Sequence, residues 1–196
     1  MVQKIKLGMV GGGQGAFIGA VHRIASRIDD RYELVAGAFS SDAERALASG
    51  KELGILEDRN YQNFQEMAEK ESTRTDGIDV VSIVTPNHLH VPIAKIFAEK
   101  GIHIICDKPI GMSSEEAIDL KKVIESKKLI FALTHNYTGY PMVRHARSLV
   151  QKGDLGSLRV VQAEYPQDWL TTKAEDSGLK QAEWRTDPNR SGAGGC

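Results

Sequence analysis

The sequence predicts an α/β fold in which a doubly wound parallel sheet carries helices on both faces. Short apolar runs alternate with segments of helical spacing through the first two-thirds of the 196 residues. The run 78–84 is rich in β-branched residues, which is typical of a parallel strand covered on both faces. A glycine-rich turn also follows the first apolar run and precedes a helix.

In the first half of the chain, short apolar runs predict the strands, and helical spacing predicts the segments between them. One helix is expected to present a shared apolar face made of Ile18, Val21, Ile24, Ala25 and Ile28. Ser41 or Asp42 is expected to cap the next helix. The predicted strands are 5–10, 32–39 and 78–84, and the predicted helices are 18–28, 42–53 and 64–71.

In the second half, end signals mark the helices. Gly101 predicts the stop of one helix, and Ser113-Ser114-Glu115-Glu116 has the pattern of a capping box that opens the next. The predicted helices are 87–100 and 113–127, and the predicted strands are 102–106 and 129–134.

The pattern changes after residue 136. We expect a helix over 141–152, stopped by Gly153, and a half-exposed strand over 158–165. The segment after residue 165 is polar and rich in glycine and proline. Residues 1–136 are therefore predicted to form a complete first domain, and residues 137–196 the incomplete start of a second, because one helix and one strand leave apolar faces uncovered.

Composition excludes several classes of protein. Lys and Arg total 25 against 26 Asp and Glu, without a basic stripe, so nucleic acid is not an expected partner. No apolar run approaches the ~20 residues of a membrane span, and no signal peptide is evident. Cys106 and Cys196 have neither metal-ligand nor disulfide-framework spacing. A cytoplasmic protein without a metal site is the expectation, with Cys106 as a buried thiol.

The glycine-rich turn is a candidate site for the phosphates of a dinucleotide. Glycines allow close backbone approach to a pyrophosphate, and the following helix supplies free N–H groups. The segment satisfies G-x-G-x-x-A from Gly11, whereas Gly19 lies where a longer loop would place the last glycine. A merely flexible loop is the alternative. The cofactor-binding candidates are Gly11, Gly13, Gln14, Gly15, Ala16, Phe17 and Ile18.

The end of the second strand bears on the choice between NAD and NADP. Ser40 stands where an acidic residue would hold the ribose 2′-hydroxyl of NAD. Ser40, Ser41 and Arg45 together could take a 2′-phosphate, which favours NADP slightly. A simple helix cap is the alternative interpretation.

Two further turns follow strands and are expected at the same edge of the sheet, where ligands bind in doubly wound folds. Thr85, Pro86, Asn87 and His90 form one group of cofactor-binding candidates. Asp107, Lys108 and Pro109 form the other, in which the Lys108 ammonium could hydrogen-bond a substrate hydroxyl and a ribose oxygen. Pro109 would stiffen this turn, and a cis bond is possible. A surface lysine beside a turn proline is the alternative. Asn136 or Tyr137, after the last strand, could touch substrate.

These motifs, in this order, resemble the Gfo/Idh/MocA oxidoreductase family. The resemblance rests on the glycine turn, Thr85-Pro86-Asn87, Asp107-Lys108-Pro109, and Trp184-Arg185 followed by Asp187-Pro188. It implies that residues 1–136 are an NAD(P)-binding Rossmann domain and that residues 137–196 are the incomplete start of a C-terminal α/β substrate and oligomerisation domain. Intact members are expected to be homo-oligomers. It makes Lys108 the catalytic lysine beside the nicotinamide, and places Pro86 and Asn87 along the cofactor. Tyr137, Trp184 and Arg185 become candidate substrate contacts.

The sequence departs from the family pattern in two respects. Asp107 replaces the usual glutamate. The family's Asp-x-x-x-His segment, whose histidine accepts the hydroxyl proton, would come after Cys196, so the chain is expected to be a fragment without its catalytic base. The predicted function is hydride transfer between a sugar, inositol or similar polyol and NAD or NADP. The alternatives are an NAD-dependent glycoside-cleaving relative and a non-enzymatic dinucleotide-binding module.

Overall fold

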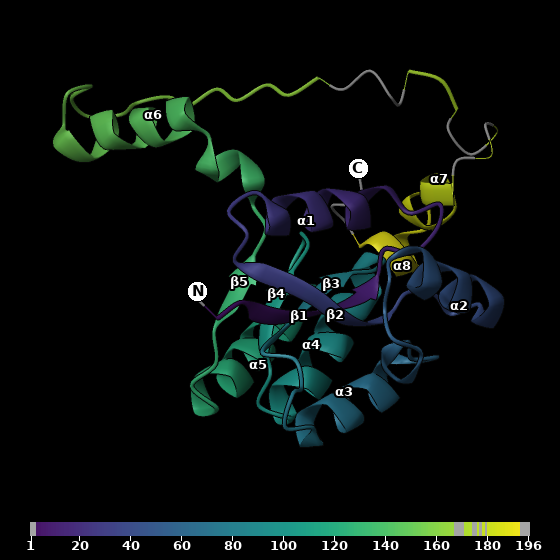
Figure 1. Cartoon of the computed structure of the whole chain (residues 1–196). Coiled ribbons are helices and arrows are strands. Elements are labelled where there is room, and N and C mark those ends of the chain that lie inside the picture. The colour runs from purple at the N-terminus through teal and green to yellow at the C-terminus, as the bar shows by residue number, and fades with distance from the viewer. Residues whose placement is uncertain (1–2, 167–170, 174–175, 177, 179, 193–196) are drawn as a thin grey trace.

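The computed structural model describes residues 3–166, 171–173, 176, 178 and 180–192. Its centre is a five-stranded sheet of parallel strands in the order β2-β1-β3-β4-β5, which confirms the predicted Rossmann-type α/β fold. Figure 1 shows α1 on one face of the sheet and α3, α4 and α5 on the other. A single parallel bridge between Gly37 and Asn60 extends the sheet beyond β2.

The strands are β1 (Ile5–Gly11), β2 (Tyr32–Ala38), β3 (Val80–Val84), β4 (His103–Cys106) and β5 (Phe131–Leu133). The α-helices are α1 (Phe17–Arg27), α2 (Ala43–Glu52), α3 (Phe64–Thr73), α4 (His90–Glu99), α5 (Ser114–Ser126), α6 (Pro141–Lys152), α7 (Lys180–Arg185) and α8 (Pro188–Ser191). Short 3₁₀ turns are η1 (Glu57–Arg59), η2 (Asn87–Leu89) and η3 (Asn136–Gly139). None of the helices in the described ranges has the length and apolar character needed to cross a membrane.

The predicted helix stops and the predicted Ser113 cap are confirmed, whereas Glu116 accepts a different N–H from the one that a capping box predicts. Gly101 and Gly153 have φ of +80° and +78°, the left-handed conformation that ends a helix at low cost. Ser113 caps α5, its Oγ accepting the N–H of Glu116 at 3.3 Å. The Glu116 carboxylate accepts the N–H of Met112 at 2.9 Å, one residue before the position that a capping box predicts.

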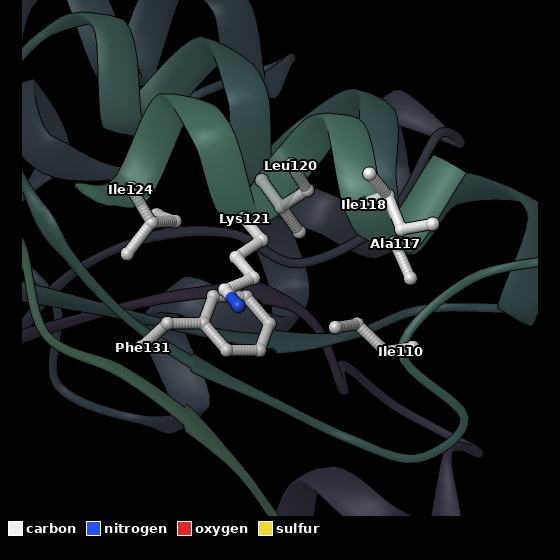
Figure 2. A pocket seen from close by; sticks show the side chains of 7 residues that line it. All are labelled: Ile110, Ala117, Ile118, Leu120, Lys121, Ile124 and Phe131. Carbon is white, nitrogen blue, oxygen red and sulfur yellow. The ribbon is translucent and has the colours of Figure 1, made fainter. Parts of the chain in front are cut away.

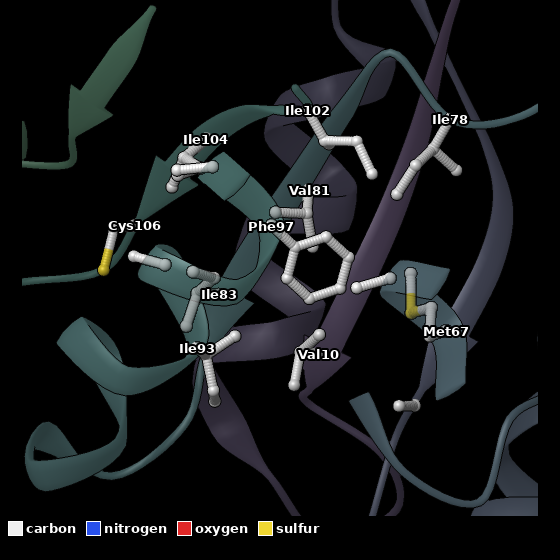
Figure 3. Close-up of a cluster of buried hydrophobic side chains, with 14 of the residues drawn as sticks. Val10, Met67, Ile78, Val81, Ile83, Ile93, Phe97, Ile102, Ile104 and Cys106 are labelled. Atoms are coloured by element: carbon white, nitrogen blue, oxygen red, sulfur yellow. The ribbon is translucent and has the colours of Figure 1, made fainter. Parts of the chain in front are cut away.

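The main hydrophobic core lies between the sheet and helices α3, α4 and α5. Phe97 of α4 is fully buried at its centre (Figure 3). Cys106 is buried at the end of β4, as predicted, and burial raises the pKa of its thiol to about 12. Cys196 lies outside the described residues. This core holds the strands whose carboxyl ends form the candidate site.

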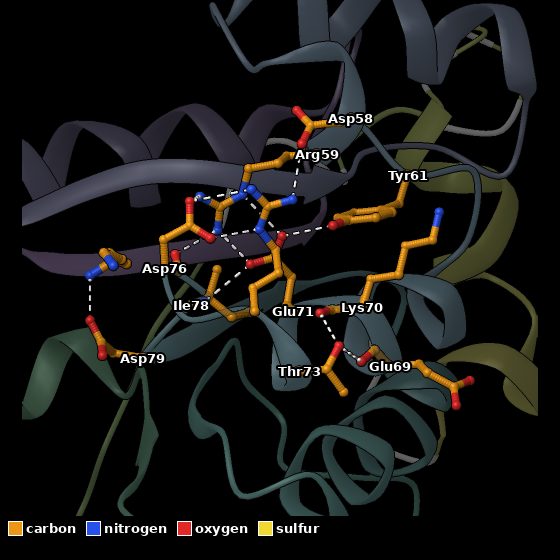
Figure 4. A network of polar contacts seen from close by, with 12 residues as sticks. Asp58, Arg59, Tyr61, Glu69, Lys70, Glu71, Thr73, Asp76, Ile78 and Asp79 are labelled. Atoms are coloured by element: carbon orange, nitrogen blue, oxygen red, sulfur yellow. Dashed lines mark hydrogen bonds and ion pairs between the residues drawn. The ribbon is translucent and has the colours of Figure 1, made fainter.

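A buried polar network joins η1, α3 and the start of β3 (Figure 4). The Arg59 guanidinium pairs with the Glu71 carboxylate, and one of these contacts is 3.0 Å long. The same carboxylate accepts the Tyr61 hydroxyl at 2.7 Å and the Ile78 N–H at 3.1 Å. Glu71 is 2% exposed, so its charge depends on these donors.

The apolar face predicted for α1 does not face the core. Val21, Ile24 and Ile28 are 41%, 56% and 81% exposed, although Ile18 packs against the smaller core cluster. A Cβ on Gly19 would lie only 2.4 Å from the Gly12 Cα, so this close contact fixes how α1 is rotated. The residues that α1 instead turns inward are Gly19, His22, Arg23 and Ser26.

An apolar groove of about 320 Å³ lies between α5 and β5, away from the glycine turn. Figure 2 shows the Lys121 side chain extending over this groove toward Phe131. The groove is lined by Ile110, Ala117, Ile118, Leu120, Lys121, Ile124 and Phe131.

The strand predicted over residues 158–165 does not form, so that prediction is wrong. These residues are exposed, and Val160 and Val161 are 82% and 79% accessible. A β-strand needs a neighbouring strand to pair its N–H and C=O groups, and no described residue pairs with this segment. The α6 helix forms as predicted, and none of its residues is buried.

Candidate cofactor and substrate site

The turns that carry the predicted site residues emerge at one edge of the sheet. In the parallel register, Gly11 of β1 pairs with Val84 of β3, and Ile83 pairs with Cys106 of β4. The Asp107 N–H continues this ladder by donating to the Ile83 carbonyl at 2.9 Å. The glycine turn, the Thr85 turn and the Lys108 turn are therefore neighbours, at the edge where doubly wound folds bind ligands.

Three glycines of the turn, Gly11, Gly12 and Gly13, have no room for a side chain. Gly11 and Gly12 have φ of +82° and +71°, and a Cβ on Gly11 would lie 2.8 Å from the Val84 carbonyl oxygen. Gly12 packs against Gly19, so Gly19 is the glycine that brings the helix close to the strand, as the longer-loop interpretation predicted. Gly12 was missed among the cofactor candidates, although it lies within the same run of glycines.

Several N–H groups of this turn have partners within the protein. Gly13 donates to the Phe39 carbonyl at 3.2 Å, Gln14 to Ser49 Oγ at 3.0 Å, and Ala16 to the Gly13 carbonyl at 3.0 Å. The N–H groups of Phe17 and Ile18 begin α1 and have no intrahelical acceptor. These two donors, at the positive end of the helix dipole, fit an anionic phosphate.

A depression of about 130 Å³ beside the turn is lined by Gly12, Gly13, Gln14, Gly15, Ala16, Arg23, Ser49, Glu52 and Leu53. Arg23 Nη1 donates to the Gly12 carbonyl at 2.8 Å, so a cation supports the turn from α1. The Gln14 amide donates to Glu52 at 2.9 Å, which ties the turn to α2. Sequence reasoning missed Arg23, whose helical position gave no sign that it reaches back to the turn.

At the end of β2, Asp42 is the helix cap, accepting the Arg45 N–H at 2.8 Å. Ser40 Oγ accepts the Asp42 N–H at 3.2 Å and is thereby partly occupied. The side chains of Ser41 and Arg45 are exposed. The structure thus settles which residue caps α2, and it keeps Ser41 and Arg45 accessible beside the glycine turn.

The Thr85 turn contacts both the glycine turn and the C-terminal helices. A Cβ on Gly11 would lie 3.0 Å from Thr85 Cγ2. Asn87 is buried, and its amide donates to the Ser191 carbonyl at 2.8 Å instead of capping a helix. Pro86 stays half-buried. Helix α8 therefore packs on η2, at the edge of the candidate cofactor site.

Lys108 is exposed, and the residues on either side of it are held in place. The Lys108–Pro109 peptide is cis, as the sequence allowed. Asp107 Oδ1 accepts the Lys108 N–H at 2.9 Å and the Thr134 hydroxyl at 2.9 Å. His22 Nε2 lies 4.0 Å from the same oxygen, and its Nδ1 lies 2.9 Å from Ser82 Oγ. Burial lowers the pKa of His22, against the opposing effect of Asp107.

Tyr137 lies in η3, the turn that follows β5. Its hydroxyl is 2.6 Å from the Tyr165 hydroxyl, and this hydrogen bond raises the pKa of Tyr137. The Lys108 charge acts in the opposite direction on that pKa. The ring of Tyr137 meets those of Tyr140 and Tyr165 edge-on, each with centroids 5.5 Å apart. Tyr140 and Tyr165 were not predicted from sequence, because their proximity depends on the path of residues 153–165.

The remaining predicted site residues lie in three separate places. Asn136 is exposed at the start of η3, next to Tyr137. Trp184 and Arg185 lie in α7, with the guanidinium 5.0 Å from the Trp184 ring centroid. Figure 1 shows α7 at the opposite end of α1 from η3, so the structure does not bring these two residues to Tyr137. His90 is buried between two turns.

Comparison with known proteins identifies the class to which this fold and site belong. Residues 5–135 match the family model described as the oxidoreductase family with an NAD-binding Rossmann fold, Gfo/Idh/MocA. The match covers well over half of the chain, so the chain belongs to the Gfo/Idh/MocA family, whose members include NAD(P)-dependent dehydrogenases.

Two curated relatives align over most of this chain. The uncharacterized oxidoreductase YfiI of Bacillus subtilis is 38% identical over 185 residues, which cover 94% of this chain and 47% of YfiI. Levoglucosan dehydrogenase of Pseudarthrobacter phenanthrenivorans is 31% identical, over 86% of this chain and 42% of that protein. The chain spans about half the length of the curated relatives it matches.

Solved structures agree with the fold. An inositol dehydrogenase homologue from Azotobacter vinelandii, complexed with NAD⁺, has 33% identity and a TM-score of 0.92 over 98% of this chain and 49% of that one. A structure of an inositol dehydrogenase homologue from the same organism, complexed with NADH and myo-inositol, has 36% identity and a TM-score of 0.78, over 81% of this chain and 42% of that one.

Proposed function

We propose that the intact protein is an NAD(P)-dependent dehydrogenase that transfers hydride between a sugar, inositol or similar polyol and the nicotinamide. One observation carries the proposal: the glycine turn and Lys108 emerge at the same edge of the sheet, where Tyr137 follows the next parallel strand, β5. The related proteins that bind NAD⁺, NADH or myo-inositol support it. In this proposal, residues 137–196 belong to the substrate domain.

The chain's own residues fit a dinucleotide. The Phe17 and Ile18 N–H groups would hold the pyrophosphate, and the close packing of Gly11 and Gly12 against Val84 and Gly19 fixes the turn that presents them. Pro86 and Asn87 would line the path toward the nicotinamide half. A bound NAD⁺ or NADP⁺ would supply the hydride acceptor for the substrate.

Lys108 would orient the reacting hydroxyl. Its ammonium has three donors and can hydrogen-bond the substrate oxygen, which stabilises negative charge there as the hydroxyl proton leaves. The Tyr137 phenol would hold a neighbouring hydroxyl of the same substrate. By the family resemblance, the proton passes to the histidine of an Asp-x-x-x-His segment outside these 196 residues.

The preference for NADP over NAD stays a prediction. Ser41 and Arg45 are exposed and could contact a 2′-phosphate, whereas the Asp42 carboxylate between them adds a negative charge that opposes it. Fluorescence titration of this chain with NADH and NADPH tests which of the two cofactors binds more tightly. If the prediction holds, Arg45→Ala weakens NADPH binding about tenfold and leaves NADH binding unchanged. An equal effect on both cofactors contradicts it.

Hydride transfer is tested on the full-length protein by following NAD(P)H formation across a panel of sugars and polyols. Lys108→Ala should lower kcat about 10²–10³-fold while NADH still binds, because the ammonium acts on the reacting oxygen. Lys122→Ala, an exposed lysine of α5 paired with Asp119, is the matched control and should keep full activity. A full-length protein inert on the whole panel contradicts the proposal. Release of an aglycone without reduced cofactor would instead identify the glycoside-cleaving alternative.

A further inference from the structure

His90 is a buried histidine that contacts two of the turns at the candidate site. It begins α4 and is 1% exposed. Its Nδ1 lies 2.6 Å from the Pro109 carbonyl oxygen, and its Nε2 lies 2.9 Å from the Thr85 carbonyl oxygen. One imidazole ring therefore spans the gap between the turn after β3 and the turn after β4.

Each of these turns bears on the proposed chemistry. The Thr85 turn touches the glycine turn at Gly11 and continues into Pro86 and Asn87. The Pro109 carbonyl belongs to the residue directly after Lys108. A change in the spacing of the two turns would therefore move the Lys108 ammonium relative to a cofactor seated on the glycine turn.

The chemistry of the contacts allows one ring to hold both turns. A backbone carbonyl only accepts hydrogen bonds, and a neutral imidazole carries a single N–H. The ring can therefore donate to one of the two carbonyls while it packs against the other. Because both carbonyl oxygens lie within 2.9 Å of a ring nitrogen, the imidazole fixes the spacing of the Thr85 and Pro109 turns.

We propose that His90 is a positioning residue, whose ring bridges the Thr85 turn and the Pro109 turn as a clamp and thereby fixes the place of Lys108. The role in positioning Lys108 rests on the proposed dehydrogenase function, whereas the clamp itself does not. The Asp107 carboxylate, held by Thr134 and near His22, secures the same turn from the other side of Lys108. Lys108 is thus flanked by one anchor before it and one after it.

The clamp is tested directly by ¹⁵N NMR of the histidine side chains of this chain at about pH 7. The chain has six histidines, so the His90 signals are assigned as those that vanish in His90→Gln. The clamp predicts that a His90 ring N–H is hydrogen-bonded and exchanges slowly with solvent in the folded protein. A His90 ring N–H that exchanges as fast as those of the exposed histidines would overturn it. This result does not depend on any enzymatic activity.

The positioning role is tested by kinetics of the full-length protein. His90→Leu removes both polar contacts of the ring and should lower kcat about 10²-fold, with little change in the NADH dissociation constant, because the reacting geometry is lost while the phosphate site remains. His90→Gln keeps a donor and should fall between His90→Leu and the wild type. His145→Gln, an exposed histidine of α6, is the matched control and should match the wild type.

The two readouts separate the possible failures. If His90→Leu is folded at the assay temperature and keeps the wild-type kcat, the positioning role is wrong. If the wild-type protein turns over no substrate, the proposed function fails, and the NMR experiment still decides whether the ring bridges the two turns. Should His90→Leu fail to fold, His90→Gln supplies the kinetic comparison.

Discussion

At the residue scale, Glu71 is the clearest case of a buried charge that depends on its partners. Its carboxylate receives hydrogen bonds from Arg59, Tyr61 and the Ile78 N–H. Those donors come from two segments, residues 59–61 and the entry to β3, so one side chain of α3 joins η1 to β3. The Tyr61 hydroxyl takes part as a donor, and burial, followed by its bond to Glu71, raises the pKa of Tyr61.

Replacing Glu71 by alanine should lower the free energy of unfolding by about 3–5 kcal/mol, because it leaves the Arg59 guanidinium buried without its partner. Urea denaturation of this chain measures the loss. Glu69→Ala is the matched control on the same helix, since Glu69 is exposed and its ion pair with Lys100 is long, at 3.9 Å. It should stay within about 0.5 kcal/mol of the wild type. Equal losses for the two variants would show that the network does not stabilise the fold.

His22 gives a prediction about pH. Burial lowers its pKa in the folded chain below the unfolded value, so the unfolded state binds the proton first as the pH falls. The stability linked to His22 is therefore present above about pH 6.5 and is lost as the pH falls through the folded pKa. Urea denaturation at about pH 7.5 and pH 5.5 should show a larger loss for the wild type than for His22→Asn, by up to about 1.4 kcal/mol per pH unit. Parallel losses would refute this assignment.

At the element scale, the unit of β1, the glycine turn and α1 determines the cofactor site. Gly19→Ala should weaken NADH binding by about tenfold or more, equivalent to ~1.4 kcal/mol, because the new methyl group would lie 2.4 Å from the Gly12 Cα. Helix propensity alone predicts that this substitution stabilises α1, so weaker binding would be a specific effect of the turn. Fluorescence titration with NADH measures it.

Gly139→Ala is the control for this substitution. Gly139 lies in η3, has no left-handed φ, and has open space around an added Cβ. Its substitution should leave the NADH dissociation constant unchanged. If Gly19→Ala binds NADH as tightly as Gly139→Ala does, the close approach of helix and strand is not needed for the phosphate site.

The elements also show how far the sequence alone could lead. The parallel strands were predictable because each is a short apolar run bounded by turn signals, and the helix stops at Gly101 and Gly153 because the left-handed conformation favours glycine. The orientation of α1 was not predictable, since its most regular apolar stripe faces outward and its rotation is set by the contact of Gly12 with Gly19. The run 158–165 has a strand-like pattern, but strand pairing depends on a partner that the pattern cannot supply.

The candidate site, too, was predictable from the sequence only in part. The strand ends and the glycine spacing located the glycine turn, the Thr85 turn and Lys108, because topology alone brings those turns to one edge. Contacts between segments distant in sequence decided the rest. Arg23 reaching Gly12, Tyr165 reaching Tyr137 and Ser191 accepting from Asn87 are separated by 11 to 104 residues. No local pattern specifies such pairs.

At the scale of the whole molecule, the described residues include a Rossmann-type sheet with helices on both faces, a polar edge where the strands end, and several uncovered apolar surfaces. The edge gathers the glycine turn, the Thr85 turn, Lys108 and Tyr137. The uncovered surfaces are the outer stripe of α1, the groove between α5 and β5, and α6. In the proposed chemistry, one bound dinucleotide spans the polar edge from the glycine turn to Lys108.

The most direct measurement is an NMR titration of the ¹⁵N-labelled 21.5 kDa chain with NAD⁺ and, separately, with ADP-ribose, which lacks the nicotinamide. We predict that NAD⁺ shifts the Phe17, Ile18 and Lys108 amide signals together with one dissociation constant. ADP-ribose should shift Phe17 and Ile18 and leave Lys108 in place. If saturating NAD⁺ moves the glycine-turn signals while Lys108 stays unchanged, one cofactor does not span the two turns, and the assignment of Lys108 to hydride transfer is wrong.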